Sequence, residues 1–190
     1  MLKKITSLTI FILVILISMS VYGDIEQFDS TLIDQQSVKN DGKVQTLGIS
    51  RDQAMENLSE YFLMSEGKAM SNGQANYIGH TVDSIALLQL IGDKSDISEA
   101  ALLLGLPNDN DSVVIKNLTL IILFIHNFFP DQQEEVLDWA SDSWSKMAKI
   151  SDDSDDNISQ KKIFNGKDFK ITFYKDMGIM LLDIKQASTS

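Results

Sequence analysis

The longest apolar run beyond the N-terminal segment is Val113 to Phe129, which reads VVIKNLTLIILFIHNFF. Placed on a helix at about 100° per residue, most of its polar side chains fall on one narrow arc, and apolar residues occupy the rest. A helix that is apolar on most sides is normally buried between other elements. We therefore expect a buried central helix at about 112–129. Asn117 projects into the apolar arc, so it needs a hydrogen-bond partner there.

Two alternatives to a buried helix remain for this run. Its β-branched residues also suit a pair of buried strands. A membrane-spanning helix needs roughly 20 mostly apolar residues, whereas this run contains Lys116, Asn117, His126 and Asn127 and is closed by Pro130. We therefore expect the run to form the core of a soluble domain.

Helical periodicity predicts further helices on both sides of the central run. Ser50 followed by Gln53 matches a capping box at a helix start. Gly105 and Pro107 suit a helix stop. Helices are expected at about 50–64, 81–91, 96–104 and 130–149.

Beyond residue 157 the apolar pattern changes to a period of two, which is typical of strands. Phe169, Ile171 and Phe173 alternate with polar residues, and Asn165-Gly166 suits a tight hairpin turn. A C-terminal antiparallel β-hairpin or three-stranded meander is expected at about 160–185. An isolated hairpin is marginal in water, so its apolar face should pack on the helices.

These patterns predict an α+β fold, a mostly helical single domain around the central helix with the hairpin or meander at its C-terminal end. The domain is expected to span 50–185. The polar segment 24–49 precedes it, either as a mobile leader or with a short hairpin around Asn40-Asp41-Gly42. Residues 186–190 are expected to fray.

Residues 1–23 have the features of an export signal. Lys3 and Lys4 precede an apolar run from Ile5 to Ile17, and Gly23 ends a stretch that suits signal peptidase. Cleavage after Gly23 would leave 167 of the 190 residues. An uncleaved anchor is the alternative, because the apolar run could nearly span a bilayer. We expect the bacterial periplasm or the extracellular space, with membrane contact only through an uncleaved N-terminal segment.

Composition argues against several functions. The chain has no cysteine, hence no disulfide and no thiol nucleophile, and its net charge of −11 repels nucleic-acid phosphates. The segment Asp96 to Asn117 resembles a DNA-binding helix-turn-helix, but its second helix offers a single cation, Lys116. Phosphate contacts need several basic residues. We therefore expect no nucleic-acid partner.

No metal or catalytic site stands out. The acidic stretches near 108–111 and 152–156 lack the alternating ligands and central glycine of a calcium-binding hand, and weak calcium binding there stays open. His80 and His126 lack a zinc-site spacing, and no G-x-S-x-G nucleophile elbow exists. The sequence therefore predicts no cofactor, no metal site and no enzymatic activity.

These observations favour an exported acidic protein that binds another protein, as an inhibitor, immunity factor or assembly helper. Its acidic stretches would steer a basic partner. Trp139, at the rim of an apolar helix stripe, could add an aromatic contact. A carrier of a small apolar ligand and a secreted hydrolase are the alternatives. The candidate partner surface comprises Trp139, Asp109, Asp111, Asp152, Asp153, Asp155 and Asp156.

Overall fold

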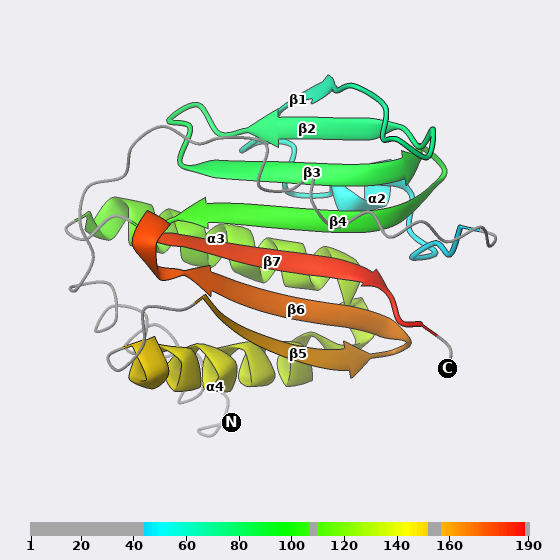
Figure 1. Ribbon diagram of the computed structural model, residues 1–190. Coiled ribbons are helices and arrows are strands. Elements are labelled where there is room, and N and C mark those ends of the chain that lie inside the picture. Colours follow the sequence, from blue (N-terminus) through cyan, green and yellow to red (C-terminus); the bar gives the residue numbers. More distant parts are fainter. Residues whose placement is uncertain (1–43, 107–109, 152–156, 189–190) are drawn as a thin grey trace.

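The computed structural model describes residues 44–106, 110–151 and 157–188. Within these ranges, the protein is built on a seven-stranded, wholly antiparallel sheet of order β1-β2-β3-β4-β7-β6-β5 (Figure 1). The strands are β1 (Leu63–Glu66), β2 (Asn76–His80), β3 (Ala86–Asp93), β4 (Asp96–Gly105), β5 (Ile158–Phe164), β6 (Lys167–Tyr174) and β7 (Ile179–Gln186).

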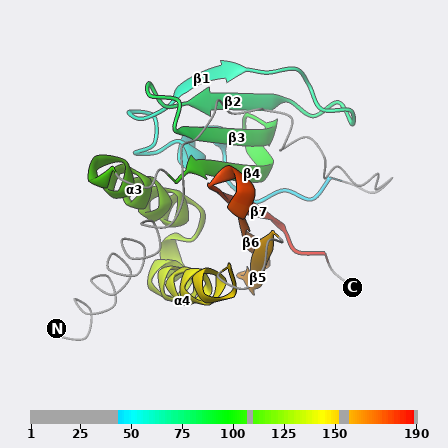
Figure 2. The same cartoon turned by 60° about the vertical axis from the view of Figure 1, so that its left-hand side comes forward.

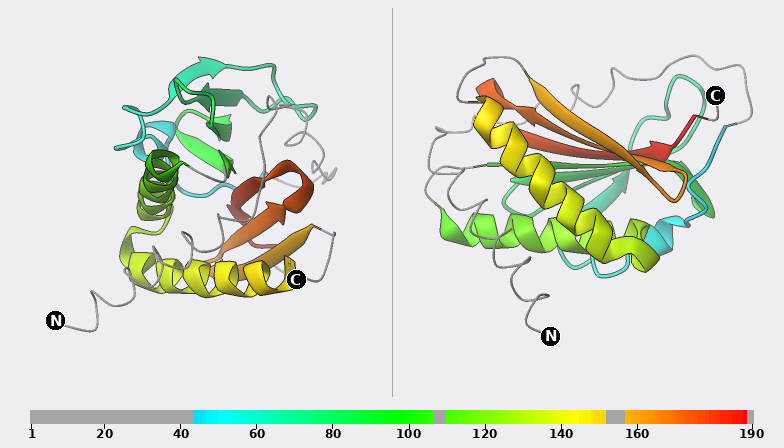
Figure 3. Two further views of the ribbon diagram at one scale, coloured as in Figure 1. Left: turned by 90° about the vertical axis from the view of Figure 1, so that its left-hand side faces the viewer. Right: turned by 90° about the horizontal axis from the view of Figure 1, so that it is seen from below.

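Two long helices, α3 (Asp111–Phe128) and α4 (Gln133–Ser151), lie on one face of this sheet (Figures 2 and 3). The short helix α2 (Arg51–Ala54) precedes the first strand. Short 3-10 turns, η4 (Pro130–Gln132) and η5 (Lys175–Met177), join α3 to α4 and β6 to β7. In the chain, the two helices thus lie between two meanders, β1 to β4 and β5 to β7. The pairing of β4 with β7 joins these meanders at the middle of the sheet.

The expectation of a mostly helical domain is wrong, because the segments expected as helices at 81–91 and 96–104 contain strands β3 and β4. Both strands are buried along most of their length. Leucine and alanine suit helices, but a short, continuously apolar run also suits a central strand that is covered on both faces. Burial in the sheet therefore overrides helical propensity here.

The region 50–64 shows a similar difference. The capping box is present, since Ser50 Oγ accepts from the Gln53 backbone N–H at 3.2 Å. The helix nevertheless ends at Ala54, and the chain continues in turns to Tyr61. Asn57 has a positive φ of 60°, which is incompatible with a continuing right-handed helix. Asp96 to Asn117 likewise forms β4 and the start of α3, not a helix-turn-helix.

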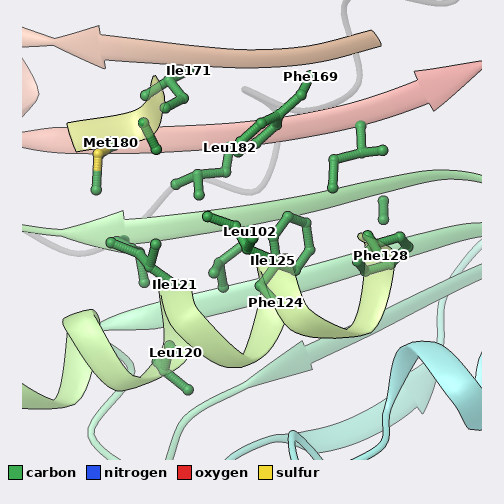
Figure 4. Close-up of a cluster of buried hydrophobic side chains, with 14 of the residues drawn as sticks. Leu102, Leu120, Ile121, Phe124, Ile125, Phe128, Phe169, Ile171, Met180 and Leu182 are labelled. Carbon is green, nitrogen blue, oxygen red and sulfur yellow. The ribbon is translucent and has the colours of Figure 1, made fainter. Parts of the chain in front are cut away.

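The helix expected at about 112–129 is present as α3, but it packs on a sheet and is not surrounded by other helices. Ile121, Phe124, Ile125 and Phe128 point toward β4, β6 and β7, where buried side chains such as Leu102 and Leu182 meet them (Figure 4). Phe124 and Phe128 are fully buried, with ring centroids 4.8 Å apart. By length and composition α3 could cross a membrane, and half of it is buried inside the protein. This burial fits a core helix.

The C-terminal strands expected at about 160–185 are present as β5, β6 and β7, within the larger sheet. Asn165 and Gly166 both take positive φ angles, 46° and 74°, in the β5–β6 turn, as a tight hairpin requires. The apolar face of this meander packs against the helices. Residues 1–23, with the expected export signal, and 24–43 lie outside the described residues.

Candidate functional site

The face of the sheet opposite α3 and α4, here called the helix-free face, carries a band of polar side chains. Side chains alternate across a strand, and Leu102, Leu182 and Ile171 point toward α3. Their strand neighbours therefore point the other way. One cross-strand row on this face runs Gln89, Ala101, Asp183, Lys170 and Lys161, and the next runs Ile91, Glu99, Lys185, Asp168 and Ile163.

Acidic and basic residues face each other at three positions in these rows, whereas Lys170 lies opposite another lysine, Lys161. Glu99 lies opposite Lys185, Lys185 lies opposite Asp168, and Asp183 lies opposite Lys170. Opposite charges on facing strands stabilise a sheet modestly. Lys161 Nζ also contacts Asp168 Oδ2 diagonally, at 2.5 Å. The band is thus a charge network of three carboxyl groups and three lysines on strands β4 to β5.

At the centre of the band, Glu99 and Asp183 are hydrogen-bonded to each other through their side chains. Two carboxyl groups form such a bond only when one of them is protonated. Burial, and then the neighbouring Asp183 carboxylate, raise the pKa of Glu99 from 4.5 to about 7. Burial also raises the pKa of Asp183, against the effect of Lys185 and Lys170. The pair therefore holds a proton up to neutral pH.

Three buried acceptor atoms of this band have no hydrogen-bond partner: Gln89 Oε1, Asp168 Oδ1 and Asp183 Oδ1. Their residues are only 4%, 5% and 7% exposed. The remaining side-chain atoms are engaged, since Gln89 Nε2 donates to Asn76 Oδ1 at 3.0 Å and Asp168 Oδ2 meets Lys161. Most buried polar atoms in proteins have a partner, so these three acceptors on one face are exceptions in the folded chain.

Two of the residues predicted as a partner surface, Asp111 and Trp139, lie away from this band. Asp111 is exposed at the first position of α3. Trp139 is partly buried on α4, where its ring lies 5.5 Å from that of Phe164 and 5.4 Å from that of Phe169. Of the predicted surface, only Asp111 and Trp139 are therefore placed. Asp109, Asp152, Asp153, Asp155 and Asp156 lie outside the described residues.

The two histidines lie on different elements of the fold. His80 is exposed at the end of β2, and His126 is exposed near the end of α3, where its Nδ1 lies 3.1 Å from Gln133 Oε1. In the described part of the chain, no three His, Asp or Glu side chains converge as metal ligands would.

Sequence reasoning missed the polar band because β3 and β4 were interpreted as helices. A carboxylate or amide within an apolar helix stripe has no defined cross-strand neighbour. The available signal was Asp183 and Lys185 within the apolar strand IMLLDIK, and Glu99 ahead of AALLL. Their register could be known only once β4 was paired with β7.

Comparisons with protein-family models, with curated proteins and with solved structures find no match for this chain.

Proposed function

We propose that this protein binds another protein through its helix-free face, and that the partner presents arginine side chains to Gln89, Asp168 and Asp183. The observation that carries the proposal is the set of three buried, unpaired acceptor atoms on one face. A buried polar atom without a partner costs about 1–3 kcal/mol. These atoms are buried in the isolated chain, so the face must rearrange locally before donors from a partner can reach them and remove that cost.

The chemistry of the acceptors selects the partner. A guanidinium group has five N–H donors in a fixed planar fork and accepts no hydrogen bond, so it fits a carboxylate and an amide oxygen together. Ala101 lies between Gln89 and Asp183 in the cross-strand row and is itself buried. The net charge of −11 attracts a basic partner over a longer range.

Apolar side chains flank the polar band at both edges of the same face. Leu63 on β1 is 59% exposed and Ile163 on β5 is 57% exposed. Leu63 pairs with His80, and Ile163 pairs with Asp168, which places both on the helix-free face. Apolar contacts around a polar centre exclude water and strengthen the hydrogen bonds within. This arrangement supports a binding surface with the polar band at its centre.

Acidic residues elsewhere belong to the same proposal. Asp111 is exposed at the start of α3, and with the acidic stretches of the sequence it would raise the association rate with a basic partner more than the final affinity. An exported chain would meet this partner in the periplasm or outside the cell. An inhibitor, immunity factor or assembly helper would act in this way, by occupying a partner's surface.

The test compares two Asp→Asn substitutions, each of which removes one negative charge, on opposite sides of the sheet. Asp168→Asn alters the helix-free face, whereas Asp142→Asn alters an exposed position on α4. Gln89→Met removes an unpaired acceptor without changing charge. The full chain and these variants, first checked for folding by circular dichroism, capture proteins from a cell-envelope extract at low and high salt.

We expect the wild-type chain to capture a partner at low salt and to lose it at high salt. Asp142→Asn should still capture this partner, whereas Asp168→Asn and Gln89→Met should not. Purified partner should then slow amide hydrogen exchange in β4, β6 and β7. A partner that all three variants retain equally would refute the assignment of this face. Concentration-dependent dimerisation in light scattering, lost in Asp168→Asn, would assign the face to a second copy of this chain and overturn the proposal.

A further inference from the structure

Glu99 and Asp183 lie on β4 and β7, the two strands that meet at the middle of the sheet. Asp183 pairs with Ala101, which follows Glu99 by two residues on the same face of β4, so the two carboxyl groups are diagonal neighbours. Their side chains are hydrogen-bonded to each other, which requires a proton between them. A shared proton therefore lies at the centre of the helix-free face.

Each of these carboxyl groups also has a lysine directly opposite on the next strand. Lys185 faces Glu99, and Lys170 faces Asp183. The positive charges of these lysines favour ionisation of the two carboxyl groups. The same side chains thus have two possible arrangements: one diagonal carboxyl–carboxyl bond, which needs a proton, and two straight ion pairs, which need none. Because the arrangements differ by a proton, their relative stability depends on pH.

The surroundings of the pair oppose its full ionisation. Burial raises the pKa of both carboxyl groups, and the Asp168 carboxylate also raises the pKa of Asp183. Strand β3 presents Gln89 and Ile91, which carry no charge. The remaining charged or titratable groups of the strands around the pair are Lys161 and Tyr174, with Asp93 and Asp96 at the β3–β4 turn. Burial and repulsion on one side, and the lysines on the other, therefore bring the two arrangements close in free energy.

From these two arrangements we propose that the Glu99–Asp183 pair is a proton-operated switch of the helix-free face. With the proton present, the diagonal bond holds the two carboxyl groups together beside Ala101. When the proton leaves, repulsion separates them, Glu99 pairs with Lys185, Asp183 pairs with Lys170, and the face gains one negative charge. This separation is the local rearrangement that gives a partner's donors access to Asp183, so the role of the switch in binding rests on the proposed function.

The switch operates near neutral pH. Burial, and then the neighbouring Asp183 carboxylate, raise the pKa of Glu99 to about 7. The ionised fraction of the pair therefore falls about tenfold between pH 8 and pH 6, and the affinity for a partner that needs this form falls with it. By reciprocity, partner binding releases up to one proton. The protein thus captures its partner at neutral to alkaline pH and releases it in mildly acidic surroundings.

The first test needs no partner. A neutral, soluble gadolinium chelate broadens the NMR signals of accessible groups, and the methyl group of Ala101, which is 4% exposed, reports on the space beside the pair. In the full chain this broadening should increase at least about twofold from pH 6 to pH 8, because the ionised fraction increases about tenfold. In Glu99→Gln it should stay at its low value, since the amide donates to Asp183 without a proton that can leave.

Two further variants complete this comparison. Asp183→Asn keeps a donor for Glu99 in the same way, so it decides the result if Glu99→Gln does not fold. Glu60→Gln removes a negative charge at an exposed position outside the sheet and should behave as wild type.

The second test is calorimetric titration with an N-acetylated, C-amidated tetra-arginine peptide. Its charge is constant in this range, because its ends are blocked and arginine stays protonated. Wild type and Glu60→Gln should bind the peptide about tenfold more weakly at pH 6 than at pH 8. Glu99→Gln should bind weakly at both. Changes of charge in the rest of the chain are common to all variants and therefore cancel in the comparison.

Three results separate the two proposals. Unchanged broadening of Ala101 in wild type, or an equal increase in Glu99→Gln, would overturn the switch. Peptide binding with the same pH dependence in wild type and Glu99→Gln would overturn it as well. If Ala101 responds as expected but the peptide binds at neither pH, the switch stands and the arginine partner of the proposed function fails.

Discussion

The side-chain nitrogen of Asn117 donates to the backbone oxygen of Gly105 at 2.8 Å, which joins the middle of α3 to the last residue of β4. Asn117 is 3% exposed, so water does not replace this bond. Asn117→Leu leaves the Gly105 oxygen without this donor. We expect a loss of about 1–3 kcal/mol in the free energy of unfolding, measured with urea.

Ile115→Ala on the outer side of α3 is the control for that substitution. Ile115 is 63% exposed, and changes at such positions usually stay within about 0.5 kcal/mol. Equal effects of Asn117→Leu and Ile115→Ala would show that the buried hydrogen bond adds no stability.

The pair Glu99 and Asp183 predicts that stability falls as pH rises toward neutrality. The folded protein holds a proton on Glu99 up to a pKa of about 7, whereas the unfolded chain releases it near 4.5. Stability from this group is complete below the lower value and is lost as pH rises through the higher one. The shift corresponds to about 3 kcal/mol at most. The raised pKa of Asp183 acts in the same direction.

Urea midpoints between about pH 4.5 and pH 8 measure this dependence. Glu99→Gln keeps a donor for Asp183 but has no proton to lose, so its curve should be flatter in this range. Parallel curves for wild type and Glu99→Gln would assign the pH dependence to other groups.

Gly92 lies at the irregularity between β3 and β4, where the strand register shifts. Its φ is +118°, and a Cβ there would lie 2.7 Å from the backbone nitrogen of Ser98. Gly92→Ala therefore combines backbone strain with a clash, and we expect a loss of more than about 3 kcal/mol. Thermal unfolding followed by circular dichroism measures the loss.

A matched substitution separates the two causes. Gly73 also has a positive φ of +84°, but a Cβ there meets nothing within 4 Å. Gly73→Ala should cost about 1–2 kcal/mol from strain alone. If both variants lose the same stability, the clash at Gly92 contributes nothing.

Trp139 should contribute to stability and not to partner binding. Its ring packs on Phe164 and Phe169 between α4 and the β5–β6 hairpin, on the helix side of the sheet. Loss of a large buried aromatic group costs about 3–5 kcal/mol, and less for one that is partly exposed. Trp139→Ala should therefore lower the melting temperature while partner capture persists at temperatures where the variant is folded.

Sequence patterns predicted α3, α4 and the C-terminal strands because each has one clear periodicity. They also predicted that Asn117 needs a buried partner, which its Nδ2 finds in the Gly105 oxygen, while its buried Oδ1 has none among the described residues. Strands β3 and β4 were mistaken for helices because strands buried on both faces lose the alternation that marks a half-buried strand. Leucine and alanine, which favour helices, then decided the interpretation.

The polar band of the candidate site was missed because of that same error. Glu99 and Asp183 are 84 positions apart in numbering, and only the pairing of Ala101 with Asp183 brings them together. Hydrophobic periodicity along one segment carries no information on which strand lies beside it. The unpaired acceptors of Gln89, Asp168 and Asp183 could therefore be recognised only in the assembled sheet.

The pairing of β4 with β7 also has a consequence for biosynthesis. Residues 96–105 are made well before their neighbour on one side, the strand at 179–186, which is the last of the seven in chain order. Until that strand emerges, a nascent chain leaves the open edge of β4 and the apolar surface of α3 without their native cover, and such long-range pairings form slowly. Chaperones and translocation machinery act on chains in that incomplete state. The order of strands thus delays closure of the core until β7, the last of the seven strands in chain order, has been synthesised.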